Sequence, residues 1–232
     1  MLIDDAHVFD RSRCLACMTC ARGCNSRALE PVAREMTVEE ALAEVEKDRA
    51  FYEESGGGLT ISGGEPTAQM EFTLELASRA KAAGISTCIE TCGFGPVDNF
   101  IGLIPVVDLF LWDIKDTDGT RHLTNTGVTL PPLLYNLRRL DHAGGATVLR
   151  CILLAGVNLN EEHLRGIAAI CRELTSCRGI ELLAFHPLGG SKLERLGTRP
   201  RPTADLAPSS EAMSAARAYL AELVGREGIV AP

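Results

Sequence analysis

The sequence predicts an α/β fold built on a parallel sheet, and three observations support this class. Five short apolar runs of strand length are separated by segments in which apolar residues recur at helical spacing. The alternation of strands with helices indicates a parallel sheet, because parallel strands need crossover connections that cover both faces of the sheet. Hydrophobic residues make up 46% and charged residues 23% of the 232 residues, which is a globular composition and excludes a disordered chain.

The predicted strands follow one another from residue 59 onward. They are Leu59–Ser62, Ile85–Glu90, Val106–Ile114, Thr147–Leu154 and Ile180–Phe185. Before the first strand, a capping box at Thr37 and Glu40 predicts a helix that ends near Glu54. After the last strand, residues 186–208 are rich in Gly, Pro and basic residues and are expected to form a long loop, a kind of segment that is usually functional or mobile.

Four further helices are indicated by apolar residues that repeat every three or four positions and by residues that favour helix ends. The apolar sets are Phe72, Leu76 and Ala80 before Gly84; Leu133, Leu137 and Leu140 before Gly144; Leu164, Ile167, Cys171 and Leu174 after Asn160; and Ala215, Tyr219 and Leu223 after Ser209 or Ser210.

Charge and hydrophobicity restrict the class of protein further. The formal net charge of −8 argues against a broad nucleic-acid-binding surface. No apolar run approaches the roughly 20 residues that a membrane-spanning helix needs. The first residues are acidic, whereas a secretory signal begins with basic residues followed by an apolar stretch. We therefore expect a cytoplasmic protein that binds neither nucleic acid nor membrane.

Four of the nine cysteines are clustered near the N-terminus: Cys14, Cys17, Cys20 and Cys24. In a reducing compartment such a cluster favours metal ligation over disulfide bonds. The spacing Cys-x2-Cys-x2-Cys-x3-Cys is the ferredoxin pattern for a [4Fe–4S] cluster, with zinc or no metal as the alternatives. Residues 1–35 contain little apolar material and need a cofactor to become ordered. We therefore expect an iron–sulfur segment at 1–35 and a second domain at 36–232.

Polar residues and glycines follow the predicted strands at the ends where parallel α/β folds bind ligands. The candidates are Gly63, Gly64 and Glu65 after the first strand, Asp113 and Lys115 at the third, and His186 after the fifth, with Arg150 and Asn158 as weaker candidates on the fourth. Each also has an ordinary structural explanation: a turn, a solvated ion pair or a hydrogen-bonded histidine. Because the carboxyl ends of parallel strands share one edge, we expect the candidates to converge on one concave rim.

Four segments resemble the glycyl-radical-enzyme activating proteins of the radical S-adenosylmethionine superfamily. They are Gly57–Pro66 (GGLTISGGEP), Ile89–Phe94 (IETCGF), Asp108–Lys115 (DLFLWDIK) and His186–Gly189 (HPLG), and the similarity extends from about Phe9 to about Leu223. The resemblance implies a partial (β/α)6 barrel that binds S-adenosylmethionine across its rim. By this resemblance Gly63, Gly64 and Glu65 would contact the methionine amino group. Asp113 and Lys115 would hold the carboxylate, sulfonium and ribose region, and His186 the nucleoside.

The same resemblance implies a reaction and its partners. A reduced [4Fe–4S] cluster would cleave S-adenosylmethionine to a 5′-deoxyadenosyl radical, which takes a hydrogen atom from a glycine of a glycyl radical enzyme. A flavodoxin or ferredoxin would supply the electron.

The chain departs from the family pattern in its cysteines. The family's catalytic motif, Cys-x3-Cys-x2-Cys, is absent, because Cys20 and Cys24 have the x3 spacing but Arg27 stands at the third position. We therefore expect a chain that lacks the N-terminal part and first strand of a longer protein, keeps half of a ferredoxin-like insert, and cannot form the radical by itself. An unpaired sheet edge beside Leu59–Ser62 follows. In two-cluster ferredoxins the fourth cysteine of a run ligates the other cluster, so Cys24 is expected to serve a cluster whose remaining ligands lie before Met1.

Two other functions remain open. The absent motif favours a non-catalytic iron–sulfur protein for electron transfer or partner binding on a degenerate barrel, although the strand-end motifs argue against it. A Schiff-base aldolase using Lys115 would explain the barrel but not the clustered cysteines. The colour of the anaerobically purified protein distinguishes the aldolase, because iron–sulfur proteins are brown.

Overall fold

The computed structural model describes residues 2–3, 6–7, 9–197 and 203–225 and divides the chain into two compact units. The first, which we call the cysteine unit, comprises Met1–Met36 and Pro187–Thr203. The second, the sheet unit, comprises Thr37–His186 and Ala204–Pro232. The sequence placed a single boundary at residue 36, whereas the structure groups Pro187–Thr203 with the N-terminal residues. One contact between these two segments of the cysteine unit is the hydrogen bond that the Arg11 guanidinium donates to the carbonyl of Arg195.

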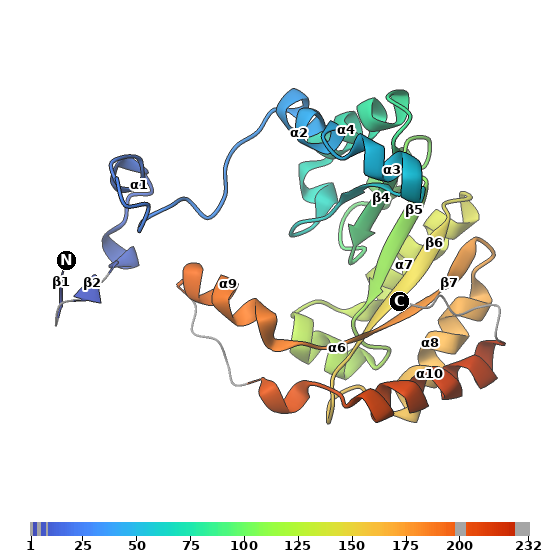
Figure 1. Ribbon diagram of the computed structural model, residues 1–232. Coiled ribbons are helices and arrows are strands. Elements are labelled where there is room, and N and C mark those ends of the chain that lie inside the picture. Colours follow the sequence, from blue (N-terminus) through green and yellow to red (C-terminus); the bar gives the residue numbers. More distant parts are fainter. Residues whose placement is uncertain (1, 4–5, 8, 198–202, 226–232) are drawn as a thin grey trace. The chain divides into compact units, whose positions relative to one another are not determined.

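The sheet unit contains the five-stranded parallel sheet that the sequence predicted (Figure 1). Its strands, in spatial as well as chain order, are β3 (Gly58–Ile61), β4 (Ser86–Thr91), β5 (Leu109–Ile114), β6 (Thr147–Leu153) and β7 (Cys177–Ala184). The predicted bounds differ most from the observed ones at two strands. Strand β5 begins three residues later than predicted, and β7 begins three residues earlier. Within the described part of the chain, no strand pairs with the outer side of β3, which therefore forms one edge.

The two faces of the sheet differ in burial. Along β5, Phe110, Trp112 and Ile114 are buried, whereas the alternating Leu111 and Asp113 are only half-buried. Successive side chains of a strand point to opposite faces, so one face packs under the helices and the other is more open. The register places Asp113 beside Arg150 and Arg150 beside Glu181 on the open face.

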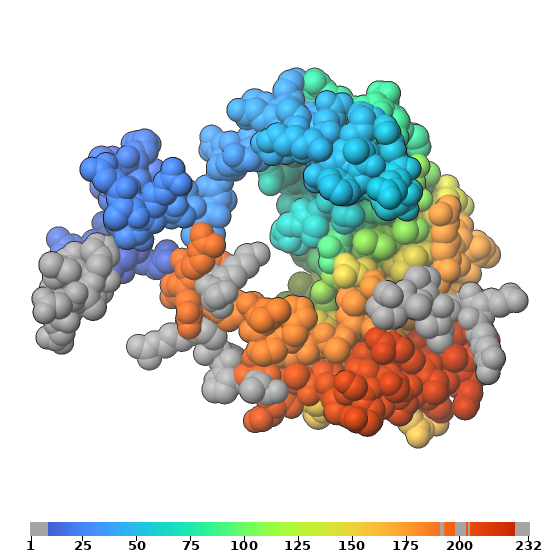
Figure 2. Space-filling view, viewed as in Figure 1, coloured from blue at the N-terminus to red at the C-terminus, as the bar shows by residue number. Residues whose placement is uncertain are grey.

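Helices cover the buried face and the ends of the sheet. They are α2 (Val38–Glu46), α3 (Arg49–Ser55), α4 (Met70–Ala82), α5 (Val97–Leu103), α6 (Gly119–Thr126), α7 (Leu130–His142), α8 (Glu161–Glu173) and α10 (Ser210–Val224). The core under the sheet includes Phe100, Trp112, Leu137, Ile167 and Leu220, all fully buried. Figures 1 and 2 show α2 and α3 at one end of this unit and α10 at the other.

The four helices predicted after the first strand are confirmed as α4, α7, α8 and α10. The single helix expected from Thr37 to Glu54 is wrong, because the chain breaks between α2 and α3. The capping box at Thr37 and Glu40 is present, but the turn at Lys47 and Asp48 redirects the chain so that Arg49 donates to the carbonyl of Ala83 at the end of α4 (3.1 Å). Helices α5 and α6 were not predicted, since each has at most eight residues and few apolar repeats.

The cysteine unit consists of short elements. In its described part, one antiparallel pair of two-residue strands is the only sheet. The elements are β1 (Leu2–Ile3) paired with β2 (Ala6–His7), the 3-10 turn Arg11–Arg13, α1 (Thr19–Arg22), the 3-10 turn Pro187–Gly189 and α9 (Gly190–Arg195). The segment 186–208 is therefore not the structureless loop that was expected: α9 and two 3-10 turns occupy it, with residues 198–202 outside the described residues. Among the helices that the structure describes in either unit, none is long and apolar enough to cross a membrane.

Candidate functional site

The exit of β3 carries the two candidate glycines. Gly63 has φ of +135°, a conformation that favours glycine, and both Gly63 and Gly64 are exposed. A Cβ atom added at either residue would meet no atom within 4 Å. The space beside their backbone is therefore open, and a ligand can approach the peptide groups closely.

Glu65, which follows, joins the exits of β3 and β4. Its carboxylate accepts hydrogen bonds from the Thr91 hydroxyl (2.8 Å), the Cys92 backbone nitrogen (3.0 Å) and the Thr67 hydroxyl (3.0 Å). The Cys92 thiol also donates to it (3.2 Å), and burial raises the pKa of that thiol, with the neighbouring carboxylate adding to the effect. Most of the acceptor capacity of Glu65 is thus used inside the protein. Its evident structural role is to hold the two strand exits together.

The exit of β4 is held in place by one residue that the sequence analysis did not single out, Asn136. Asn136 of α7 donates to the carbonyls of Gly93 and Gly95, both at 2.9 Å. Gly93 has φ of +77°, and a Cβ there would lie 2.1 Å from the Trp112 ring. The sequence did contain a signal for this role, because Asn136 stands among the apolar helix residues Leu133, Leu137 and Leu140. An unpaired amide on such a buried face is costly, so the side chain was bound to have hydrogen-bond partners.

The exit of β5 presents an ion pair toward the open face of the sheet. Lys115 donates to the carboxylate of Asp113 at 2.6 Å, with side-chain exposures of 40% and 16%. The two-residue spacing places both side chains on the same side of the strand, and they form the ion pair that is the ordinary structural explanation for these residues. A partly exposed pair of opposite charges can exchange its internal partner for those of a zwitterionic ligand.

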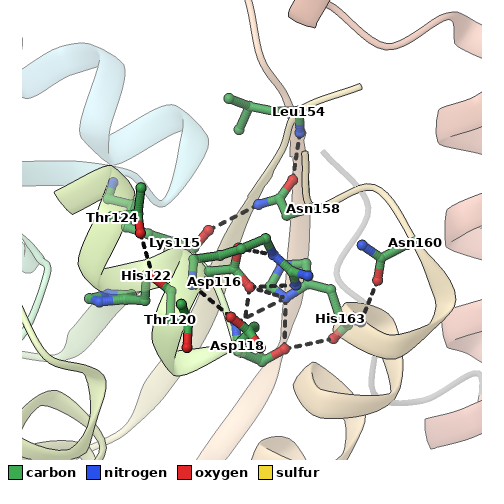
Figure 3. A network of polar contacts seen from close by, with 12 residues as sticks. Lys115, Asp116, Asp118, Thr120, His122, Thr124, Leu154, Asn158, Asn160 and His163 are labelled. Carbon is green, nitrogen blue, oxygen red and sulfur yellow. Dashed lines mark hydrogen bonds and ion pairs between the residues drawn. The ribbon is translucent and has the colours of Figure 1, made fainter. Parts of the chain in front are cut away.

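Asn158 ties the exit of β5 to that of β6. Its amide donates to the carbonyls of Lys115 (2.9 Å) and Ile152 (3.0 Å), and its oxygen accepts from the Leu154 nitrogen (2.7 Å). Figure 3 shows the side chain between the two strands. Asn158 is 1% exposed and fully hydrogen-bonded, so it positions the rim, and its candidacy for direct ligand contact is not supported.

A second buried network stabilises the turn after Lys115 (Figure 3). The carboxylate of Asp116 accepts from the Asp118 nitrogen (2.9 Å) and from two nitrogens of Arg121 (2.8 and 2.9 Å). Burial raises the pKa of Asp116, but the hydrogen bonds from Arg121 and Asp118 outweigh it and leave the pKa below its usual range. The turn is therefore built around a carboxylate whose ionised form these hydrogen bonds favour.

His163 of α8 completes this network as a neutral ring. The backbone nitrogen of Thr117 donates to its Nδ1 atom (3.1 Å), which places the ring proton on Nε2. The side chain is fully buried, and burial lowers its pKa to about 4. Nε2 has no hydrogen-bond partner among the described residues. His163 therefore packs as a neutral group and does not act as a charge partner for Asp116.

Arg150 lies in a row of charges across the open face. It contacts Glu90 of β4 (2.5 Å) and Glu181 of β7 (2.9 Å). Burial lowers the pKa of Arg150, but the two glutamates and Asp113 reverse the effect and raise it overall. The weaker candidate Arg150 thus belongs to the same face as Asp113, beside which it lies in the strand register, within β6 rather than beyond its end.

His186 lies beyond the end of β7 and is exposed. Among the residues described, no hydrogen bond or ion pair joins it to the other candidates. The structure thus places Asp113 just before the carboxyl end of β5 and the other five candidates just beyond the carboxyl ends of parallel strands. It links Glu65 to the β4 exit and Asp113 to Lys115, and leaves Gly63, Gly64 and His186 open to solvent.

The candidate metal ligands lie in the cysteine unit, around a cavity of about 450 Å³. Cys14, Cys17 and Cys20 line it together with apolar residues such as Leu29 and Val32. Cys24 is not among the lining residues, and its thiol accepts from the Leu29 nitrogen (3.4 Å). The structure therefore separates the first three cysteines of the run from the fourth.

Local backbone geometry prepares these thiols for metal binding. Ala16 and Met18 have φ of 53° and 57°, which turns the chain around the cavity. The Ala16 nitrogen donates to the Cys14 sulfur (3.3 Å). Hydrogen bonds from Thr19 lower the pKa of Cys17, and those from Ser26 and Leu29 lower the pKa of Cys24. Each effect favours the thiolate, which is the form that binds iron.

The chemistry of the cysteines that line the cavity fits an iron–sulfur cluster. Thiolates are the ligands that hold such clusters, and Cys14, Cys17 and Cys20 stand at ferredoxin spacing around one cavity. In the described part of the chain, no group of three or more His, Cys, Asp or Glu side chains is gathered closely enough to hold one metal ion.

The chain is similar to known proteins over most of its length. The model of the radical SAM superfamily matches residues 12–167. The isethionate sulfite-lyase activating enzyme of Nitratidesulfovibrio vulgaris is 38% identical over 94% of this chain and 71% of its own. The pyruvate formate-lyase 2-activating enzyme of Escherichia coli is 34% identical over 94% of this chain and 74% of its own. A crystal structure of a domain of pyruvate-formate lyase-activating enzyme from Bacteroides vulgatus superposes with a TM-score of 0.62 and 25% identity, over 76% of this chain and 99% of that domain.

The chain therefore belongs to the radical SAM superfamily, whose members use a [4Fe–4S] cluster and S-adenosylmethionine. Within it, the named relatives are activating enzymes of glycyl radical enzymes. The predicted family, fold class and enzyme class are confirmed, and the non-catalytic alternative is not favoured. The chain spans 56% to 74% of the length of these relatives.

Proposed function

We propose that the chain binds S-adenosylmethionine on the carboxyl-end rim of its sheet and acts as the S-adenosylmethionine-binding part of an activating enzyme for a glycyl radical enzyme. The observation that carries this proposal is the sequence of strand exits: an open glycine backbone after β3, an ion pair after β5 and an exposed histidine after β7. A zwitterionic amino acid joined to a nucleoside matches these groups in charge.

Each rim residue has a role that its chemistry permits. The carbonyls near Gly63 and Gly64 can accept from the methionine ammonium, because no side chain blocks them. Lys115 can pair with the methionine carboxylate once it leaves Asp113, and Asp113 can then accept from ribose hydroxyls near the sulfonium. His186 can stack on the nucleoside. Glu65 holds the glycine turn against β4 as a positioning residue.

The iron–sulfur group belongs to the cysteine unit. When bound and reduced, such a cluster supplies the electron chemistry on which radical SAM enzymes depend. Cys14, Cys17 and Cys20 would hold one cluster at their shared cavity, while Cys24 would ligate another. The proposed reductant is a flavodoxin or ferredoxin. We further propose a cytoplasmic protein that binds neither nucleic acid nor membrane, in keeping with its net charge of −8.

Equilibrium binding of S-adenosylmethionine by calorimetry tests the rim. We expect Asp113→Asn to weaken binding at least about 10-fold, since a charge-assisted hydrogen bond is worth roughly 1.5–3 kcal/mol. Asp98→Asn, which makes the same change at an exposed residue of α5, is the matched control and should bind like the parent chain. Equal affinities for all three proteins would contradict the proposed site.

A second experiment tests the catalytic part. The 232-residue chain, reconstituted anaerobically with iron and sulfide and then reduced, should release no 5′-deoxyadenosine on chromatography, because it contains no Cys-x3-Cys-x2-Cys motif. Adding an extension that carries this motif should restore release. Release by the chain alone would show that the four clustered cysteines suffice, and failure of the extended chain would contradict the proposed activity.

A further inference from the structure

Two cysteines that the proposed function does not use lie against each other at the start of β7. Cys171 is in the last turn of α8, and Cys177 is the first residue of β7. Their sulfur atoms are 3.8 Å apart, and both side chains are half-buried. The two thiols are thus close to each other and partly accessible from solvent.

Hydrogen bonds hold the backbone between the two cysteines in place. The turn that joins the two cysteines is tied to the buried Asp141 of α7. Its carboxylate accepts from the nitrogens of Thr175 (3.0 Å) and Ser176 (2.6 Å) and from the Thr175 hydroxyl (3.0 Å). A disulfide bond is about 2.05 Å long, so the sulfurs need to approach by roughly 1.7 Å, which side-chain rotation can supply.

The interaction between the two thiols also shifts their pKa values in opposite directions. The Cys171 thiol donates to Cys177, which is the main cause that lowers the pKa of Cys177 to about 6; burial opposes it, and the Gly179 backbone and the Thr147 side chain add to the lowering. The same interaction raises the pKa of Cys171. A thiolate beside a protonated thiol is the arrangement that nucleophilic dithiols use.

We propose that Cys171 and Cys177 are a redox-active dithiol that small disulfides such as oxidised glutathione convert into an intramolecular disulfide bond. The Cys177 thiolate attacks one sulfur of oxidised glutathione, which forms a mixed disulfide and releases one glutathione thiolate. Cys171 then loses its proton and attacks the Cys177 sulfur, which forms the internal bond and releases the second glutathione. The protein loses two electrons and two protons in total, and one oxidised glutathione becomes two reduced molecules.

This site is separate from the rim. Cys177 lies at the opposite end of β7 from Ala184, a distance of roughly 23 Å along the strand. The proposed disulfide ties the end of α8 to the start of β7 and touches none of the candidate ligand residues. The inference therefore does not depend on the proposed function.

Peptide mapping after oxidation tests the proposal on the full chain. The reduced, folded protein is exposed to oxidised glutathione, free thiols are blocked by alkylation, and the chain is cleaved with trypsin. Arg172 and Arg178 are cleavage sites, so a bond between the two cysteines joins the separate peptides 166–172 and 173–178. We expect this joined pair as the main product involving either cysteine, and its disappearance on reduction.

Two variants separate the steps. Cys171→Ser should leave the mixed disulfide of Cys177 with glutathione as a stable product, whereas Cys177→Ser should leave Cys171 unmodified. Cys88 is a half-buried thiol of β4 whose pKa is raised by burial and by Asp108, and it serves as the internal comparison. At pH 6, alkylation of Cys177 should be at least about 10-fold faster than that of Cys88.

Three results would overturn the proposal. One is recovery of peptides 166–172 and 173–178 unlinked and alkylated after oxidation. Another is a dominant bond from Cys177 to the buried Cys151. The third is formation of the joined pair only after denaturation in urea, which would show that the folded structure does not bring the sulfurs together.

Discussion

The cysteine unit and the sheet unit obtain their order from different sources. In the cysteine unit, none of the residues whose burial is described is buried, and large apolar side chains such as Leu15 (89% exposed) face solvent. The sheet unit has a continuous core with fully buried residues such as Trp112 and Leu149. The chain thus combines a sheet unit that is ordered by a buried core with a segment whose side chains are arranged around an apolar-lined cavity.

The largest expected effect is the loss of bound iron from the cysteine unit, without a matching loss of stability in the sheet unit. Replacing Cys14, Cys17 and Cys20 together by serine should reduce iron bound after anaerobic reconstitution to background, because all three thiols line the cavity. The unfolding free energy of the sheet unit should change by less than about 1 kcal/mol, since none of its core residues is altered. Colorimetric iron assay and urea denaturation measure both. Cys88→Ser is the control, and unchanged iron in the triple variant would remove the cavity as the cluster site.

The next effect is confined to the core of the sheet unit. Trp112→Ala should lower the free energy of unfolding by about 3–5 kcal/mol, because Trp112 is fully buried against Phe100 and Gly93. Tyr135→Ala, at a half-exposed aromatic residue of α7, should cost less than about 1 kcal/mol. Denaturant titration followed by circular dichroism provides the numbers. A loss of bound iron in folded Trp112→Ala protein would show that the two units are coupled.

Acid should weaken the sheet unit through His163. Its pKa is lowered by burial to about 4 from an ordinary 6.5, so the unfolded chain takes up the proton first as the pH falls. The stability contribution is complete above pH 6.5 and is lost progressively toward pH 4, by about 3 kcal/mol in total. Urea titrations between pH 7 and pH 4.5 should show this slope. The slope of unfolding free energy against pH should flatten in His163→Asn. It should persist in the control His142→Asn, which changes an exposed histidine. An unchanged slope in His163→Asn would show that His163 is not the group responsible.

The smallest effect concerns the surface of the sheet unit. Arg138 and Glu173 form an ion pair at 2.7 Å, and their side chains are 47% and 50% exposed. A double-mutant cycle with Arg138→Ala and Glu173→Ala should give a coupling energy below about 1 kcal/mol that decreases with added salt. A larger coupling would mean that surface charges contribute to this unit's stability on the scale of its core.

Much of the sheet unit could be predicted from sequence because its local signals agree with its tertiary environment. The capping residues Thr37, Asn160 and Ser209 begin helices as expected, and the apolar runs became parallel strands. The failures occurred where a distant contact decided the outcome. Arg49 turns the chain toward the carbonyl of Ala83 and divides one expected helix into two, and no local signal at Lys47 or Asp48 indicated that contact.

The candidate site shows the same division. The sequence by itself determined which chemical groups follow each strand, because side-chain type and strand period are local properties: the open glycines, the pair Asp113 and Lys115, and four cysteines at ferredoxin spacing. Only the tertiary structure decided that Glu65 is held by the β4 exit, that Asn158 joins two strands, and that Cys24 does not line the cavity of the other three cysteines. These outcomes depend on which acceptors and donors lie opposite one another across strands, and residues far apart in sequence supply them.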